Sequence, residues 1–322
     1  LETCQPSAAY SQHRCSQTAS LQHAATQLYC TITRLQLTEP TLPLFVDAPI
    51  EVTFRRMEFS LEPDAFPKYW YAGSPSLTHF FNALSAVFPD GEKYFIDSVR
   101  AFEDALTDPR LKARVGEFTR QEGHHTHHHR HFNRLIQTMG VPMDRCASIA
   151  RDILDRSRRR DSPHMQLAMT AAFEHFTALM GDWLLRRDAE QLTAAHPAAA
   201  PLWLWHAVEE TEHKAVAFDV YQTVCGSYWL RILALLRVTA IFIPRVHQMQ
   251  LLLLREDPQP LSPGDVGRCL RYLYGRGGFV LGLVPGYLRY FRRSFHPWQD
   301  DNSHLISNWQ AKYAHYAVPP AA

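Results

Sequence analysis

Two Glu-x-x-His motifs on separate predicted helices constrain this chain more than any other feature. The first spans Glu122 to His125 and the second spans Glu210 to His213. Residues three apart lie on the same face of a helix, so each motif can direct one carboxylate and one imidazole towards a common point. A single glutamate on a helical segment, Glu92 or Glu174, precedes each motif. The chain therefore repeats one pattern twice: a helical glutamate, then a Glu-x-x-His helix.

This pattern predicts a pair of bound metal ions. A glutamate from each of two helices plus Glu-x-x-His from each of two others is the ligand set of di-iron and di-manganese four-helix bundles. Four ionised carboxylates carry a charge of about −4, which balances two divalent cations. Buried without cations, they would repel one another and have raised pKa values. We expect two iron ions, with manganese and zinc as the alternatives.

A third histidine extends the second motif. His206, Glu210 and His213 share one helical stripe, so we expect His206 as a seventh ligand, the alternative being a histidine hydrogen-bonded behind a ligand. His129 lies on the stripe of the first motif, where it could be either a ligand or a histidine hydrogen-bonded behind one. Asp219 is a candidate acceptor for a hydrogen bond from a ligand histidine. The predicted metal ligands are Glu92, Glu122, His125, Glu174, His206, Glu210 and His213.

The predicted fold class is all-α: a ferritin-like four-helix bundle with extra helices, including a C-terminal helical extension. Capping residues and prolines mark the helix ends, with Ser74 as one N-cap. A run of arginines at 156–160 is interpreted as an exposed turn, and 193–200 as a loop. The expected helices cover residues 75–87, 89–106, 108–140, 142–156, 162–187 and 201–224.

Three regions follow from these patterns. Residues 1–45 have no hydrophobic period and are predicted to be a weakly ordered tail; residues 46–226 form the di-metal bundle, in which 52–59 is a short extended segment. Residues 227–322 form the C-terminal helical extension that packs on the bundle. Its apolar stretches contain arginines, which fit a transmembrane span poorly. We expect packing against the bundle, with peripheral membrane contact as the alternative.

Composition limits the remaining classes. The 322 residues are 46% hydrophobic and include 18 histidines, a number that fits metal binding. Their net charge of +1 gives no basic field that would attract nucleic acid. Six cysteines without a C-x-x-C pair predict a reducing compartment. The first 35 residues lack an apolar run, so we expect no signal peptide. The expected location is cytoplasmic, with membrane association as the alternative.

Several short segments resemble the bacterial family of predicted metal-dependent hydrolases, over about residues 52–297. They are Arg55–Phe59, Asn82–Ser85, Phe88–Glu92, Ser98–Arg100 and Gln121–Glu122. The ligand pattern itself is similar to that of ferritin-like di-iron carboxylate enzymes. The additional His206 resembles the seventh ligand of the p-aminobenzoate N-oxygenase group, and that likeness implies the same seven ligands given above.

The leading functional hypothesis is an enzyme that activates O₂ at two iron ions and oxygenates or desaturates a small organic or lipid-like molecule. Such an enzyme needs a separate electron donor, because the chain has no flavin or iron–sulfur motif. A homodimer is compatible with this hypothesis. The alternatives are a hydrolase in which two metal ions activate water, as the family description suggests, and a non-catalytic metal-binding or storage protein.

Overall fold

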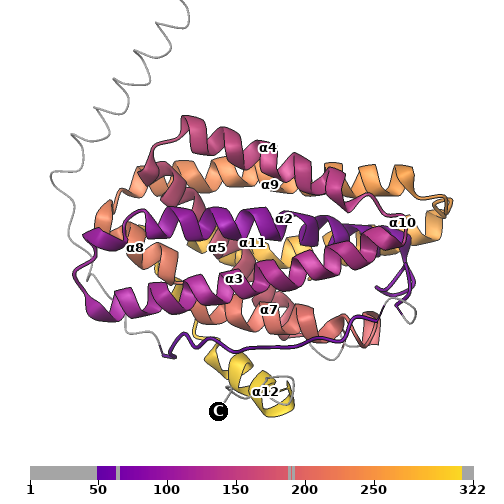
Figure 1. Ribbon diagram of the computed structural model, residues 1–322, viewed down its shortest axis with the longest axis horizontal. Helices are drawn as coiled ribbons and strands as arrows, with labels where there is room; N and C mark the ends of the chain where they lie inside the picture. Colours follow the sequence, from indigo (N-terminus) through magenta and orange to yellow (C-terminus); the bar gives the residue numbers. More distant parts are fainter. Residues whose placement is uncertain (1–48, 63–65, 188–189, 191–192, 314–322) are drawn as a thin grey trace, which may run out of the picture. The chain divides into compact units, whose positions relative to one another are not determined.

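The computed structural model describes residues 49–62, 66–187, 190 and 193–313; most of these residues are helical, and none of them forms a strand (Figure 1). The predicted all-α fold class is therefore confirmed. The predicted tail at residues 1–45 lies outside the described residues. The α-helices are α2 (Pro75–Arg100), α3 (Pro109–Thr138), α4 (Met143–Arg160), α5 (Pro163–Leu185), α7 (Ala200–His213), α8 (Val216–Val224), α9 (Tyr228–Glu256), α10 (Pro263–Tyr274), α11 (Phe279–Arg289) and α12 (Ser303–Tyr313).

Helix α2 is one continuous helix, so the predicted break at Pro89 is wrong. Its N-terminus is capped as expected, because the Ser74 hydroxyl accepts a hydrogen bond from the Leu77 amide at 3.1 Å. Pro89 removes one backbone donor, which normally interrupts a helix. Here α2 packs against α3, α4, α5 and α9 and most of its residues are buried. This tertiary packing outweighs the local preference of proline.

Four helices form the bundle that carries the motifs: α2, α3, α5 and α7. Helix α2 packs on α3, α5 packs on α7, and the two pairs contact each other through α2 with α5 and α3 with α7. The predicted helix 201–224 is divided into α7 and α8, directly after His213. The Lys214 ammonium donates hydrogen bonds to Asp300 O and Asn302 Oδ1, both at 2.7 Å. These contacts anchor the interruption between α7 and α8.

Helices α4, α9 and α11 cover the bundle. Helix α4 includes residues 156–160, so the predicted turn there is wrong. The helix ends at Arg160, and the carboxylate of the next residue, Asp161, accepts two hydrogen bonds from Arg237 at 2.6 and 2.7 Å. Helix α9 packs on α2 and α5. Helix α11 approaches α5 closely, because a Cβ at Gly282 would lie 2.7 Å from the Trp183 side chain. Within the described residues, no helix combines the length and apolarity that crossing a bilayer requires.

The segment before α2 is non-helical and lies against α3. The Met57 amide donates to His124 Nε2 at 3.0 Å, and the Phe54 amide donates to Glu117 Oε2 at 2.9 Å. The segment thus closes one side of the bundle, next to the first Glu-x-x-His motif.

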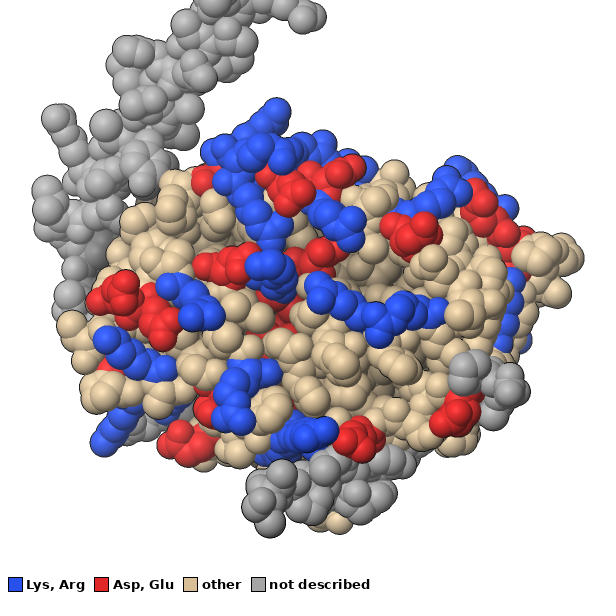
Figure 2. Space-filling view, viewed as in Figure 1, with Lys and Arg blue, Asp and Glu red and all other residues tan. Residues whose placement is uncertain are grey.

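On the face shown in Figure 2, basic and acidic side chains are interspersed and separated by broad uncharged areas.

Candidate metal centre

The seven predicted ligands meet inside the bundle in two donor groups. Within each group the candidate donor atoms lie within 4.8 Å of one another, and every residue is buried. Helices α2, α3, α5 and α7 all contribute, as the repeated sequence pattern predicts. The first donor group is Glu92, His125 and His206, and the second donor group is Glu122, Glu174, Glu210 and His213.

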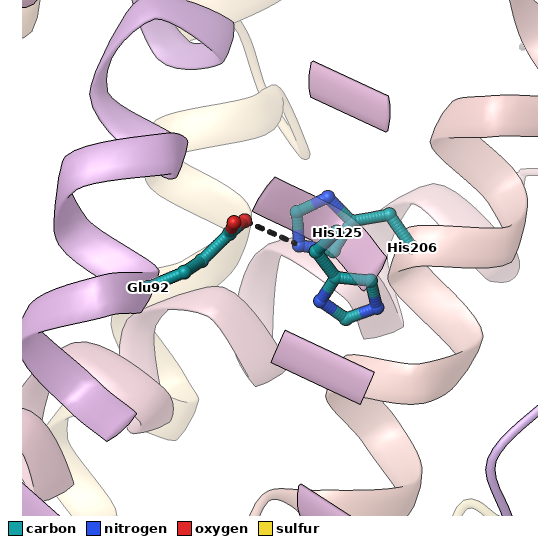
Figure 3. A group of neighbouring side chains, drawn as sticks. All are labelled: Glu92, His125 and His206. Atoms are coloured by element: carbon teal, nitrogen blue, oxygen red, sulfur yellow. Dashed lines mark ion pairs between the residues drawn. The ribbon is translucent and has the colours of Figure 1, made fainter. Parts of the chain in front are cut away.

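The first donor group brings one carboxylate and two imidazoles together. Figure 3 shows the Glu92 side chain reaching from α2 towards the rings of His125 and His206. The Nε2 atom of His206 lies 3.8 Å from Glu92 Oε1, and the ring centroids of His125 and His206 lie 4.1 Å apart. His206 therefore occupies the place that the extended second motif predicts for a seventh ligand.

Two glutamates, one from each motif, face both donor groups. Glu210 Oε1 lies 2.9 Å from His206 Nε2, while Glu210 Oε2 lies 3.5 Å from His213 Nε2. Glu122 Oε1 lies 3.1 Å from His213 Nε2, while Glu122 Oε2 lies 4.0 Å from His125 Nδ1. Each of these carboxylates thus directs its two oxygens towards different imidazoles. This is the arrangement that bridging of two cations requires, with Glu92 and Glu174 each facing a single group.

Many buried polar atoms of the two donor groups have no hydrogen-bond partner. Leaving one buried polar atom without a partner costs about 1–3 kcal/mol, and more when the group is charged. Metal ions would satisfy all of these atoms together, so the donor set fits a metal pair. Among the described residues, the buried atoms without a hydrogen-bond partner include Glu92 Oε1, both oxygens of Glu122 and Glu174, Glu210 Oε2, His125 Nδ1 and His213 Nε2.

Burial also changes the protonation of the donors. It raises the pKa of Glu92 and Glu174 well above the usual range, and the charge of Glu122 raises both further. For His213, burial alone would lower the pKa, but the charges of Glu174 and Glu210 raise it well above its usual value. Without cations, the centre therefore retains protons that metal ions would displace.

Comparison with known proteins agrees with this geometry. A family model described as "Predicted metal-dependent hydrolase" matches residues 53–301. The chain belongs to this family. The match includes both donor groups and the four bundle helices. Comparison with curated proteins and with solved structures found no match.

A layer of polar side chains behind the donors orients two of the imidazoles in this metal-dependent hydrolase family member. His125 Nε2 lies 3.1 Å from Glu209 Oε2, and His213 Nδ1 lies 2.9 Å from Gln121 Oε1. The opposite ring nitrogens, His125 Nδ1 and His213 Nε2, are then left to face the donor groups. The residue immediately before each motif glutamate thus supports the histidine of the other motif.

Arg55 links the polar side chains that orient the two imidazoles. Its guanidinium donates two hydrogen bonds to the Glu212 carboxylate, at 2.6 and 2.8 Å, and lies 3.8 Å from Glu209 Oε1. Gln121 Nε2 donates to Glu212 Oε2 at 3.0 Å, which fixes the amide orientation. No sequence pattern had indicated a role for these four residues, Arg55, Gln121, Glu209 and Glu212. Gln121 and Glu209 each stand directly before a motif glutamate, and this shared position is the sequence feature that could have indicated their role.

His206 is oriented by a chain of hydrogen bonds. The Ser85 hydroxyl donates to Asn133 Oδ1 at 2.6 Å, so its oxygen accepts from His129 Nδ1 at 2.8 Å. His129 Nε2 then accepts from His206 Nδ1 at 2.7 Å, which leaves His206 Nε2 facing the donor groups. His129 therefore lies behind a candidate ligand. Asp219 accepts instead from His296 at 3.0 Å, so its predicted role as acceptor for a ligand histidine is wrong.

Proposed function

We propose that this protein is a binuclear metal enzyme that uses O₂ to oxidise an organic substrate with an apolar body. The observation that carries the proposal is the meeting of four glutamates and three histidines from four helices, with Glu122 and Glu210 each facing both groups. The four glutamates with His125 and His213 are the donor set of di-iron carboxylate bundles, and His206 is an additional histidine. When bound, two iron ions would supply the redox chemistry that O₂ activation requires.

The protein residues hold and orient the pair. Glu92, Glu122, Glu174 and Glu210 would hold the ions together with His125, His206 and His213. Imidazole and carboxylate together suit iron, and manganese and zinc remain alternatives for the same donors. The electrons would come from a separate reductase.

The cavity beside the centre favours oxidation over hydrolysis. It touches His206 and Glu210, and aromatic and aliphatic side chains make up most of its lining. Hydrolysis develops negative charge on a substrate oxygen, which enzymes stabilise with several aimed hydrogen-bond donors. Of the hydroxyl and indole donors in its lining, the Thr177 hydroxyl already donates to the Glu174 backbone oxygen at 3.1 Å, which leaves the unpartnered Trp203 Nε1 as a single free donor. An apolar lining suits a substrate that reacts at a C–H bond.

Hydrolysis is the second candidate, because the family description favours it. Two metal ions can activate a water molecule for attack on an ester or a phosphate. In that case the outer residues Glu209 and Gln121 would orient the same imidazoles. The substrate would have to present its polar bond to a cavity with few free donors.

One experiment separates the two candidates. The protein is purified without added metal, its metal content is measured, and the reduced iron-loaded protein is mixed with O₂ in a single turnover. Rapid O₂ consumption with a matching change in the optical spectrum supports the oxidative proposal. Zinc in the purified protein, with turnover of an ester or phosphate and no O₂ consumption, overturns it in favour of hydrolysis.

A further inference from the structure

Three adjoining cavities extend from the outer helices to the donor groups. The outer cavity has a volume of about 190 Å³ and lies between α9 and α11 on one side and α2 and α5 on the other. Its lining is almost wholly apolar and includes Phe80, Phe176, Phe242, Val280 and Leu283. Of its lining residues, Val284 is 41% exposed, so the cavity reaches the surface along α11.

Two smaller cavities continue inwards. One, of about 30 Å³, shares Leu84, Met180 and Phe279 with the outer cavity and is also lined by His206 and Glu210. The other, of about 50 Å³, shares Phe176, Phe242 and Val246 with the outer cavity and is also lined by Glu92. Both inner cavities therefore end at candidate metal ligands.

The size of this space indicates a bound molecule. The outer cavity alone exceeds the roughly 150 Å³ of an engineered apolar cavity that stays dry and binds benzene. Because the outer cavity opens at Val284, its unfilled apolar lining faces water and makes few apolar contacts, which is unfavourable in proportion to the apolar area exposed. A ligand with an apolar body would supply those contacts.

The charges at the ends indicate the chemistry of that molecule. Arg245 and Glu92 are the only charged residues among the described residues that line the 50 Å³ cavity. Arg245 is exposed on α9, while Glu92 is buried at the metal centre. Helix α11 also exposes Leu281 and Leu288, so an apolar molecule meets an apolar surface before it enters.

We propose that the three cavities form one binding site for a fatty acid. Its carboxylate pairs with Arg245 at the mouth of the 50 Å³ cavity, and its unbranched chain passes through the outer cavity. The far end of the chain lies beside His206 and Glu210 in the 30 Å³ cavity. Binding of the chain is independent of what the metal centre does. That the chain is also the molecule oxidised there rests on the proposed function.

The test uses the purified full chain and a fluorescent fatty acid, cis-parinaric acid, whose emission rises in an apolar environment. Hexadecanoate should displace the probe. Met180→Trp, which fills the junction of the outer and inner cavities, should weaken probe binding more than tenfold. Val284→Trp at the exposed entrance should also weaken it and leaves the core unaltered, which covers the case in which Met180→Trp does not fold.

The head-group assignment has a matched control. Arg245→Gln should weaken hexadecanoate binding by roughly two- to fivefold, the range of an exposed ion pair, and leave binding of its methyl ester unchanged. Arg255→Gln, an exposed arginine on the same helix outside the cavities, should change neither. Equal weakening by both arginine variants overturns the head-group assignment.

The outcomes separate this inference from the proposed function. Absence of saturable probe binding, or binding that both tryptophan variants leave intact, overturns the fatty acid site even when the iron-loaded protein consumes O₂. Saturable binding that the tryptophan variants abolish supports the site even when no O₂ is consumed. In that second case only the oxidative proposal fails.

Discussion

His125 Nε2 lies 3.1 Å from Glu209 Oε2, although the two residues belong to opposite Glu-x-x-His segments. His213 and Gln121 form the reciprocal contact at 2.9 Å. Each motif therefore supplies a candidate ligand histidine, and the residue directly before it supplies the polar group that orients the candidate ligand histidine of the other motif. The two halves of the bundle must pack correctly before either imidazole is oriented, which couples folding of the bundle to formation of the centre.

The first prediction concerns this contact. Glu209→Ala should weaken metal binding by about 10- to 100-fold, because His125 loses the group that holds its ring. The measurement is metal affinity by competition with a chromophoric chelator. Glu103→Ala is the control and should bind as the unaltered protein does, because this side chain is 44% exposed and pairs with Arg100 rather than with a candidate ligand. Equal affinities for both variants would show that Glu209 does not orient a ligand.

The second prediction concerns charge in the metal-free centre. Glu174→Gln should raise the thermal unfolding temperature of chelator-treated protein, because one of four mutually repelling buried carboxyl groups, without a hydrogen bond to either oxygen, is replaced by a neutral amide. The same variant should lose most of the stabilisation that added metal gives the unaltered protein. Thermal unfolding with and without metal measures both effects. A lower unfolding temperature without metal would contradict the account.

The third prediction is a pH dependence. The pKa values of Glu92 and Glu174 are raised in the folded chain by burial, so metal-free protein loses their contribution to stability as pH rises through those raised values. Metal binding needs the ionised carboxylates, so metal affinity should increase over the same pH range. Titrations with metal and with urea at several pH values test the two opposite slopes. A metal affinity that does not change with pH would refute this prediction.

The fourth prediction concerns the spacing of α5 and α7, which carry Glu174 and Glu210. A Cβ at Gly181 would lie 2.8 Å from the Ala207 backbone oxygen, so Gly181→Ala forces the two helices apart. We expect a loss of about 1–3 kcal/mol in the free energy of unfolding. Gly116→Ala has nothing within 4 Å and should instead gain about 0.5–1 kcal/mol. Urea unfolding of both variants measures the difference, and equal effects would disprove the close approach.

Helical spacing predicted which donors would meet, because Glu-x-x-His fixes two side chains on one face without reference to the rest of the fold. The same reasoning could not predict that α2 continues through Pro89, since that depends on packing against four other helices. It also could not predict the interruption after His213, which is anchored by contacts of Lys214 with residues far along the chain.

The outer layer of the centre was harder to predict for the same reason. Arg55 reaches Glu212 across 157 positions of sequence, and no local pattern connects them. The cavities are likewise formed by α9 and α11, whose apolar residues suggested packing but did not indicate that space would be left between the helices. Local periodicity defines ligand pairs, whereas second-layer contacts and cavities depend on long-range packing.

The number of iron ions bound per chain decides whether the two donor groups hold a pair of metal ions. Chelator-treated full chain is loaded anaerobically with Fe(II), desalted and analysed for iron per chain, beside the double variant Glu122→Ala/Glu210→Ala. The account predicts two iron ions per unaltered chain and fewer than one per variant chain, because both carboxylates that face the two donor groups are absent. Fewer than one ion in the unaltered chain, or two ions retained in the variant, would contradict it.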